Sequence, residues 1–214
     1  MTLLRLRRRP LLAASLFALT LTACGGGGGG DSGGGGSTPT VPPPVTLTVT
    51  HKVRITTNQG VIDLGLDRNH APITVDNFLR YVNEGFYTNT LFHRVIKDFV
   101  IQAGGFTRNQ ANVVVEKTPG YPAIVLESQN GLSNVRGTIA MARTTVANSA
   151  TSQFYINTVD NLALNYSGAA NLGYAVFGQV TAGLDVVYKI RAVNTNSQDL
   201  PLVDVVITDA KVIP

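Results

Sequence analysis

The sequence predicts a mainly β fold, an eight-stranded antiparallel β-barrel that closes on itself and carries two α-helices as caps. Beyond about residue 46 the chain contains about eight short runs of strand character, which Gly, Asn and Ser residues separate. Only two segments show helical periodicity, so few helices are available as crossovers between parallel strands. Neighbouring strands are therefore expected to run antiparallel, and closing the sheet removes its exposed edges.

A β-hairpin opens the expected domain. Residues 47–57 (LTVTHKVRITT) alternate in polarity and are rich in β-branched side chains, which predicts a strand. Residues 58–60 (NQG) form a turn, and residues 61–66 (VIDLGL) are the expected partner strand.

Two helices are predicted from the spacing of apolar residues. The first has one face that recurs at i, i+3, i+4 and i+7, formed by Val75, Phe78, Leu79 and Val82. Pro72 suits the start of this helix, and Gly85 comes just after its end. The second helix is expected at residues 184–192, with one face formed by Leu184, Val187, Tyr188 and Arg191.

The remaining elements are predicted strands, at residues 91–96, 99–103, 137–143, 152–158, 174–180 and 202–213. With the two strands of the hairpin they complete the predicted barrel. We expect one domain over residues 46–214, a length that supports a single hydrophobic core.

Residues 1–23 are predicted to be a signal peptide of the lipoprotein type. They combine a cluster of arginines with an apolar run at residues 11–21, which is too short to span a bilayer as a mature helix. The tetrapeptide Leu21 to Cys24 resembles the lipobox of bacterial lipoproteins, which implies cleavage before Cys24 and lipidation of that residue. An ordinary signal peptide and a twin-arginine signal are the alternatives.

Residues 24–45 predict a flexible linker that begins with the lipidated cysteine. Its glycines favour a coil, its prolines favour polyproline II, and a coil of this length reaches about 25 Å. A phosphate-binding loop is disfavoured, because no strand precedes the glycines and no Lys-Ser or Lys-Thr pair follows them. Because Gly25 rather than Asp follows Cys24, lipoprotein sorting rules imply the outer membrane, and we expect the domain to face the periplasm.

The charge of the chain gives no support for nucleic-acid binding. Four of the 17 Lys and Arg residues lie in the predicted leader, so the other 13 balance the 13 Asp and Glu residues.

Cys24 is the only cysteine, which excludes a disulfide within the chain. His51, His70 and His93 lack the spacing of metal ligands, and neither a metal nor another cofactor is expected.

Residues 92–105 (FHRVIKDFVIQAGG) place polar side chains within strand-like runs. Arg94 is a permanent cation among apolar neighbours, and Gln102 lies in the next apolar run. On its own, Arg94 would be interpreted as a surface cation on an edge strand. This segment is, however, the first of four motifs that share one pattern.

The four motifs are FHRVI…FVIQAGGF, GTIAMAR, SATSQFYIN and YAVFG. In their order and spacing, residues 53–214 resemble the cyclophilin-type peptidyl-prolyl cis-trans isomerases, and most of all their periplasmic bacterial branch. The resemblance implies an eight-stranded barrel with a helix over each end, which agrees with the pattern of elements. It also implies an enzyme (EC 5.2.1.8) that isomerises X–Pro bonds without a nucleophile or a metal.

The resemblance implies a role for each residue of the candidate site. Arg94 would donate hydrogen bonds to the twisted amide, Gln102 would orient its guanidinium group, and His93 would line the groove. The implied Pro-binding pocket consists of Phe99, Met141, Tyr155 and Leu164, with Tyr174 beside it. The substrate main chain would bind to Gln153 and to the backbone around Ala142 and Arg143.

The chain departs from the family pattern at several positions without losing Arg94 or Gln102. Tyr155 stands where many members have Phe, and its hydroxyl group needs a partner. Ala163 stands where Trp or Phe occurs, which argues against tight cyclosporin binding. The family's His and Gly are matched by Tyr174 and Ala103, respectively.

Less specific interpretations stay open at this point. His93 could be catalytic, with Arg94 and Gln102, or merely packed at the edge of the groove, and Phe99 and Met141 could be ordinary core. A proline-peptide-binding chaperone module with little or no catalysis, and a tethered structural component of the envelope, are alternative functions. The expected partners are proline-containing segments of exported proteins and, through the lipid on Cys24, the membrane. We expect a monomer.

Overall fold

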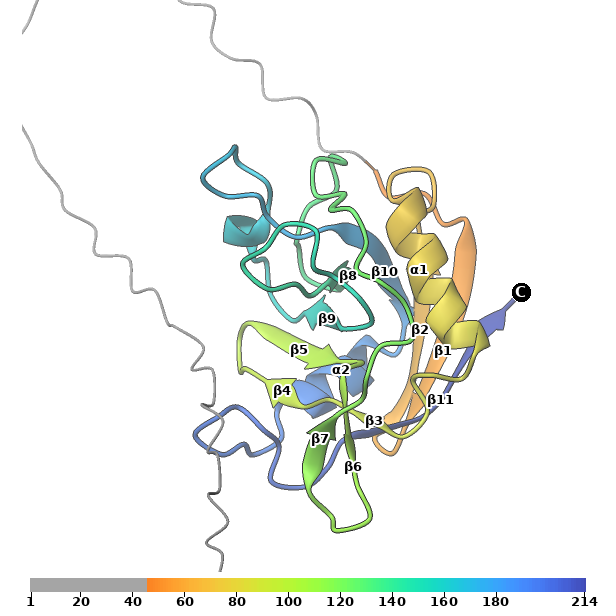
Figure 1. Ribbon diagram of the computed structural model, residues 1–214, viewed down its shortest axis with the longest axis vertical. Coiled ribbons are helices and arrows are strands. Elements are labelled where there is room, and N and C mark those ends of the chain that lie inside the picture. Colours follow the sequence, from red (N-terminus) through yellow and green to blue (C-terminus); the bar gives the residue numbers. More distant parts are fainter. Residues whose placement is uncertain (1–45) are drawn as a thin grey trace, which may run out of the picture. The chain divides into compact units, whose positions relative to one another are not determined.

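The computed structural model describes residues 46–214, which form a mainly β domain with two α-helices (Figure 1). One large sheet has the strand order β3-β11-β1-β2-β10-β8-β9-β5-β4, and all of its pairs are antiparallel. The predicted signal peptide and linker, including Cys24, lie outside the described residues.

The bounds of the elements are as follows. The large sheet contains β1 (His51–Thr57), β2 (Gly60–Leu66), β3 (Thr90–Leu91), β4 (Arg94–Val95), β5 (Val100–Ala103), β8 (Thr138–Met141), β9 (Phe154–Asn157), β10 (Val176–Ala182) and β11 (Val206–Ile213). A second sheet pairs β6 (Phe106–Arg108) with β7 (Val114–Glu116). The helices are α1 (Pro72–Asn83), the short 3-10 helix η1 (Leu162–Leu164) and α2 (Leu184–Arg191).

The prediction of a closed eight-stranded barrel is wrong in its strand count and in its closure. The sheet has nine strands and curls into a half-barrel that is open between β3 and β4. Residues 91–96 were expected to form one strand, but the pairing partner changes within them: the amide of Phe92 still donates to the carbonyl of Val205 (2.9 Å), next to β11, whereas Arg94 already pairs with Gln102 on β5. As a result β3 pairs with β11 while β4 pairs with β5.

The predicted hairpin and the first helix are confirmed, except that the first strand begins at His51 rather than at residue 47. β1 and β2 pair over their full length, from His51 opposite Leu66 to Thr57 opposite Gly60. The helix α1 begins at Pro72, which lacks only an amide that the first turn does not use, and Gly85 follows its end with φ 65°. The predicted face of α1 packs against the core: Val75, Phe78 and Val82 are buried and Leu79 is partly buried.

The predicted face of α2 is wrong in part. Val187 is buried as expected, but the other buried residues of this helix are Val186 and Ile190. Tyr188 and Arg191 instead lie together outside the core, with the guanidinium carbon of Arg191 4.9 Å from the ring centroid of Tyr188. The helix has apolar residues on two adjacent faces, and its packing against the sheet selects one of them.

Two apolar clusters divide the interior. The main core lies inside the curl of the sheet and includes most of the large buried side chains, among them Tyr81, Phe78 and Phe154. A smaller cluster, here named the floor cluster, consists of Val100, Leu132, Ala140, Tyr155 and Val176, with Leu47, Phe99, Ala142, Leu164 and Tyr174 packed against it. Among the described residues, no helix is long and apolar enough to cross a membrane.

Candidate active site

The register of the sheet explains why a cation lies among apolar residues. Arg94 on β4 is opposite Gln102 on β5, and Gln102 is opposite Tyr155 on β9. Directly paired residues point to the same face of a sheet, so these three side chains share one face. Their neighbours Val95, Ile101 and Ile156 form the alternate row, and all three are buried in the main core. Each strand thus buries one face and offers the other to a groove.

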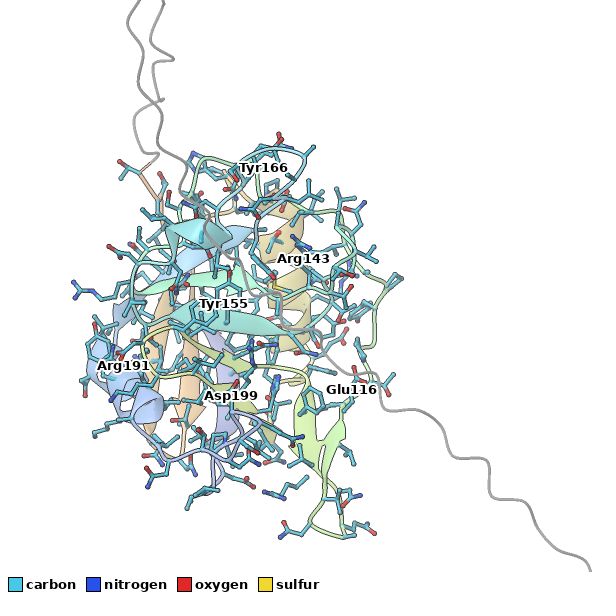
Figure 2. The ribbon with its side chains drawn as sticks, turned by 90° about the vertical axis from the view of Figure 1, so that its left-hand side faces the viewer. Glu116, Arg143, Tyr155, Tyr166, Arg191 and Asp199 are labelled. Carbon is cyan, nitrogen blue, oxygen red and sulfur yellow. The ribbon has the colours of Figure 1, made fainter. Side chains whose placement is uncertain are left out.

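Arg94 is half exposed and ion-paired. Its side chain is 43% exposed, and its Nε atom lies 3.5 Å from Oδ2 of Asp199. Asp199 belongs to the loop between α2 and β11, and its carbonyl accepts a hydrogen bond from the amide of Val95 (2.8 Å). Figure 2 looks onto this side of the domain, with Asp199 and Tyr155 both labelled. The pairing uses the Nε side of the guanidinium group, which has further donors on its terminal nitrogens.

The sequence prediction did not include Asp199. It is far from Arg94 along the chain and lies in a loop without a motif, so no spacing signal could have identified it. Its backbone has φ 61°, a left-handed conformation that few residues other than Gly adopt. This value could not be read from the sequence either.

Gln102 and Gln153 are joined to each other. Nε2 of Gln102 donates a hydrogen bond to Oε1 of Gln153 (3.0 Å). The predicted contact between Gln102 and the guanidinium group of Arg94 stays a prediction, although the two residues are paired in the sheet.

Gly105 makes room for Gln153. A Cβ atom at Gly105 would lie 2.4 Å from Cγ, 2.5 Å from Cδ and 2.6 Å from Nε2 of Gln153, so the glutamine side chain lies directly over the glycine backbone.

Gln102 and Gln153 also line a cavity of about 370 Å³, together with Glu116, Pro119, Ala142, Arg143, Thr144, Ser149 and Thr151. The predicted main-chain-binding residues Ala142, Arg143 and Gln153 are thus brought together.

The apolar part of the predicted site gathers at the floor cluster. Phe99, Tyr155, Leu164 and Tyr174 are all members of it or packed against it. The ring centroids of Tyr155 and Tyr174 are 5.8 Å apart in an edge-to-face arrangement. The Tyr155 hydroxyl donates to Oδ1 of Asn134 (2.7 Å), a partner that sequence reasoning missed. Burial raises the pKa of Tyr155, so its hydroxyl group stays protonated and remains a donor.

Met141 belongs to the other apolar cluster. It is 2% exposed, lies opposite Phe154 and packs within the main core. The structure therefore favours the interpretation of Met141 as core, and its contact with substrate stays a prediction. Ala163 is exposed on η1, next to Leu162, which is 60% exposed.

Arg143 covers Tyr174. Its guanidinium carbon lies 4.7 Å from the ring centroid of Tyr174, and its Nε donates to the carbonyl of Gly173 (2.9 Å). A cation over an aromatic face is attracted by the ring quadrupole, so Arg143 and Tyr174 hold each other in place. Figure 2 shows Arg143 in the same view as Tyr155.

His93 is partly buried and neutral. Its ring packs against Phe106, with centroids 4.4 Å apart, and its Nδ1 atom has no hydrogen-bond partner among the described residues. Burial, with a smaller contribution from the neighbouring charge of Arg94, lowers the pKa of His93 to about 4. The residue therefore carries no charge at neutral pH, which favours the interpretation of His93 as a packed wall residue.

The part of the chain that the structure describes holds no group of three or more His, Cys, Asp or Glu side chains that could bind a metal ion. A second cavity, of about 600 Å³, lies at the C-terminal end of α2, and its lining includes Val95, Arg191 and Leu202. None of the predicted site residues lines it.

Comparison with known proteins agrees with this geometry. The family described as "Cyclophilin type peptidyl-prolyl cis-trans isomerase/CLD" matches residues 52–212. The chain is 46% identical to peptidyl-prolyl cis-trans isomerase A of Dickeya dadantii (78% of this chain, 86% of the relative). It is 48% identical to peptidyl-prolyl cis-trans isomerase B of Escherichia coli (75% of this chain, 98% of the relative).

A solved structure shares the fold. A crystal structure of a cyclophilin-type peptidyl-prolyl cis-trans isomerase of Cryptosporidium parvum, obtained in the presence of the dipeptide Ala-Pro, matches with a TM-score of 0.64 at 25% identity. The match covers 76% of this chain and 99% of that chain. Taken with the family match and the bacterial relatives, these findings show that the chain belongs to the cyclophilin-type peptidyl-prolyl cis-trans isomerase family.

Proposed function

We propose that this enzyme accelerates cis–trans isomerisation of X–Pro bonds in exported proteins, with Arg94 as the group that stabilises the twisted amide. The single observation that carries the proposal is the row Arg94–Gln102–Tyr155 on one face of the sheet, beside the floor cluster. The bacterial relatives named above are peptidyl-prolyl cis-trans isomerases, which supports the same activity for this chain.

The chemistry follows from the electronic structure of the amide. The nitrogen lone pair is shared with the carbonyl group, which gives the bond a rotational barrier of about 18–20 kcal/mol. At 90° of rotation the nitrogen regains its lone pair and can accept a hydrogen bond. The guanidinium group of Arg94 keeps its charge and presents donors in a fixed arrangement, so it stabilises the rotated state more than the planar one.

The other residues bind the chain on either side of the rotating bond. Phe99, Tyr155 and Leu164 provide apolar contacts for the Pro ring, which exclude water from the amide. The side chain of Gln153 and the backbone near Ala142 hold the preceding main chain, so that only one end of the bond turns. The partly buried, neutral His93 acts as a wall of the groove rather than as a proton donor.

Replacing Arg94 tests the proposal. The fragment 46–214 is suitable, because it contains both apolar clusters and the aligned E. coli relative is matched over 98% of its length. Arg94→Ala is expected to lower kcat/KM on a short X–Pro peptide by roughly 10²–10³, the usual effect of losing one transition-state donor. Arg68→Ala is the matched control, because Arg68 is also a half-exposed arginine paired with a carboxylate, that of Asp76.

Full activity of the Arg94 variant would reject the assigned role. Lost turnover with unchanged peptide affinity would agree with it. If the variant still complements a strain that lacks the protein, the chaperone-like alternative, in which the groove binds proline-containing segments without catalysis, would become the better description.

We also propose that the domain is anchored in the outer membrane, facing the periplasm, by a lipid on Cys24. The arginine cluster, the apolar run and the sequence Leu21 to Cys24 support this, and two or more acyl chains on one residue suffice for stable anchoring. Cys24→Ser is expected to move the protein from the membrane fraction to the soluble fraction. Mass spectrometry of the mature N-terminus identifies the acyl chains, and an unmodified terminus would refute the anchor.

A further inference from the structure

A buried asparagine lies at the centre of a polar network behind the floor cluster. Asn134 is fully buried, and its Oδ1 atom accepts hydrogen bonds from the Tyr155 hydroxyl (2.7 Å) and from Nδ2 of Asn157 (3.2 Å). Its Nδ2 atom donates to the carbonyl of Leu164 (3.2 Å) and to Oδ1 of Asn165 (3.0 Å). Both ends of the carboxamide are therefore fully used, which fixes its orientation.

The network extends to a third residue of the pocket. The backbone carbonyl of Asn134 accepts a hydrogen bond from the amide of Asn161 (2.8 Å). Nδ2 of Asn161 donates to the carbonyl of Phe99 (3.0 Å) and to Oδ1 of Asn157 (2.8 Å). Phe99, Tyr155 and Leu164 come from three separate parts of the chain, and Asn134 connects all three.

The tyrosine at position 155 depends on this arrangement. Tyr155 is 4% exposed and is surrounded by the apolar side chains of the floor cluster, where an unpaired hydroxyl group would be costly. The Asn134 oxygen satisfies the hydroxyl group at the end of the ring. The ring itself is left free to form an apolar wall, as a phenylalanine would.

We propose that Asn134 is a positioning residue for the proline pocket and that Asn134 and Tyr155 work as a pair. This proposal rests on the proposed isomerase function, because it concerns the walls of the same pocket. Asn134 acts through Tyr155 and Leu164 and does not itself contact substrate. Replacing Asn134 leaves the hydroxyl group of Tyr155 without its hydrogen-bond partner. The Tyr155 ring then rotates toward another acceptor, which displaces the wall of the pocket.

A double-mutant cycle on fragment 46–214 separates this role from a purely structural one. The variants are Asn134→Ala, Tyr155→Phe and the two combined, and the readouts are kcat, KM, peptide affinity and unfolding by urea. Asn134→Ala is expected to lower kcat/KM about tenfold, chiefly through a higher KM, because the wall contacts the Pro ring in both ground and transition states. Tyr155→Phe alone removes the hydrogen bond to Asn134 but keeps the ring, so a loss of kcat/KM of about two- to threefold is expected.

The decisive result is rescue. Adding Tyr155→Phe to Asn134→Ala is expected to restore kcat/KM to within about threefold, since phenylalanine needs no partner. The loss of stability caused by Asn134→Ala is expected to persist in the double variant, because the Leu164 and Asn157 contacts remain broken. Thr57→Val, which removes a different buried hydroxyl bonded to the carbonyl of Gly60, is the control that lowers stability without changing kcat/KM.

The measurements distinguish the ways in which this proposal can fail. Equal activity of the double variant and Asn134→Ala, or unchanged kcat/KM in Asn134→Ala, would overturn the pairing. If Asn134→Ala does not fold, Asn134→Ser goes through the same cycle, because a serine hydroxyl cannot reach both Tyr155 and Leu164. If the parent protein lacks turnover, the isomerase proposal fails, and the affinity for an X–Pro peptide still tests the pairing in the same variants.

Discussion

Gly105 is expected to affect turnover although it has no side chain. The perturbation is Gly105→Ala, which adds a single methyl group. That carbon would lie 2.4 Å from Cγ and 2.5 Å from Cδ of Gln153, separations that real side chains do not tolerate. Gln153 must therefore move to another rotamer, which breaks its hydrogen bond with Gln102.

The magnitude follows from what is lost. A neutral hydrogen bond contributes about 0.5–1.5 kcal/mol net, and a loss of that size in transition-state binding lowers kcat/KM about two- to tenfold. Because Gln153 is also proposed to hold the substrate main chain, the upper end of this range is expected. The fold should survive, because the side chain that moves lines a cavity of about 370 Å³.

The assay is kcat/KM on an X–Pro peptide, with three comparisons. Gly120→Ala is the matched control, since a Cβ atom there meets nothing within 4 Å. Gln153→Ala is expected to reproduce the loss, and combining it with Gly105→Ala should add nothing further, because both act through one side chain. Full activity of Gly105→Ala, or additive losses in the double variant, would refute the reasoning.

Two other predictions concern the electrostatics around Arg94. Asp199→Asn is expected to lower kcat/KM about two- to fivefold at low salt. It should shift the urea midpoint only slightly, since a half-exposed ion pair contributes at most about 1 kcal/mol. A difference in kcat/KM that persists at 1 M salt would contradict an ionic contribution. The pKa of His93 is lowered to about 4, so the unfolded chain binds a proton at this residue before the folded protein does. The free energy of unfolding is therefore expected to fall by roughly 3 kcal/mol through this residue as the pH drops from about 6.5 to 4. Above pH 7 the charge state of His93 should have no effect on stability. Urea titrations of the parent and of His93→Gln check this, and an inflection of kcat/KM near pH 6.5 that vanishes in His93→Gln would show a catalytic rather than a packed histidine.

Local patterns were enough to predict most of the elements. The alternation in 47–57 and the 3.6-residue period of α1 each depend on neighbours in the sequence. The helix is confirmed, and the strand is confirmed from His51 onward. The same local reasoning failed for the strand count, because it could not show that the chain changes its partner from β11 to β5 between Phe92 and Arg94. It also missed the small β6–β7 sheet, whose side chains are only partly buried.

The site was predictable to the extent that it resembles a family. Arg94, Gln102 and Tyr155 were placed by motif, and the sheet register brings them onto one face. Asp199 and Asn134 could not be predicted, because each acts through a contact with a residue distant in the chain. Such contacts depend on the paths of loops, for which neither periodicity nor motif spacing gives a signal.

The pairing of β1 with β11 affects how the protein matures. The strand that follows the predicted tether hydrogen-bonds on one side to β2 and on the other to residues 207–213, near the opposite end of the sequence. A polypeptide that emerges amino end first, from the ribosome or from the export channel that the proposed anchoring would require, can form the β1–β2 hairpin early, but its sheet stays incomplete until β11 has emerged. During that interval β1 exposes an unpaired edge, so we expect the nascent protein to need protection from aggregation just when its own activity is still absent.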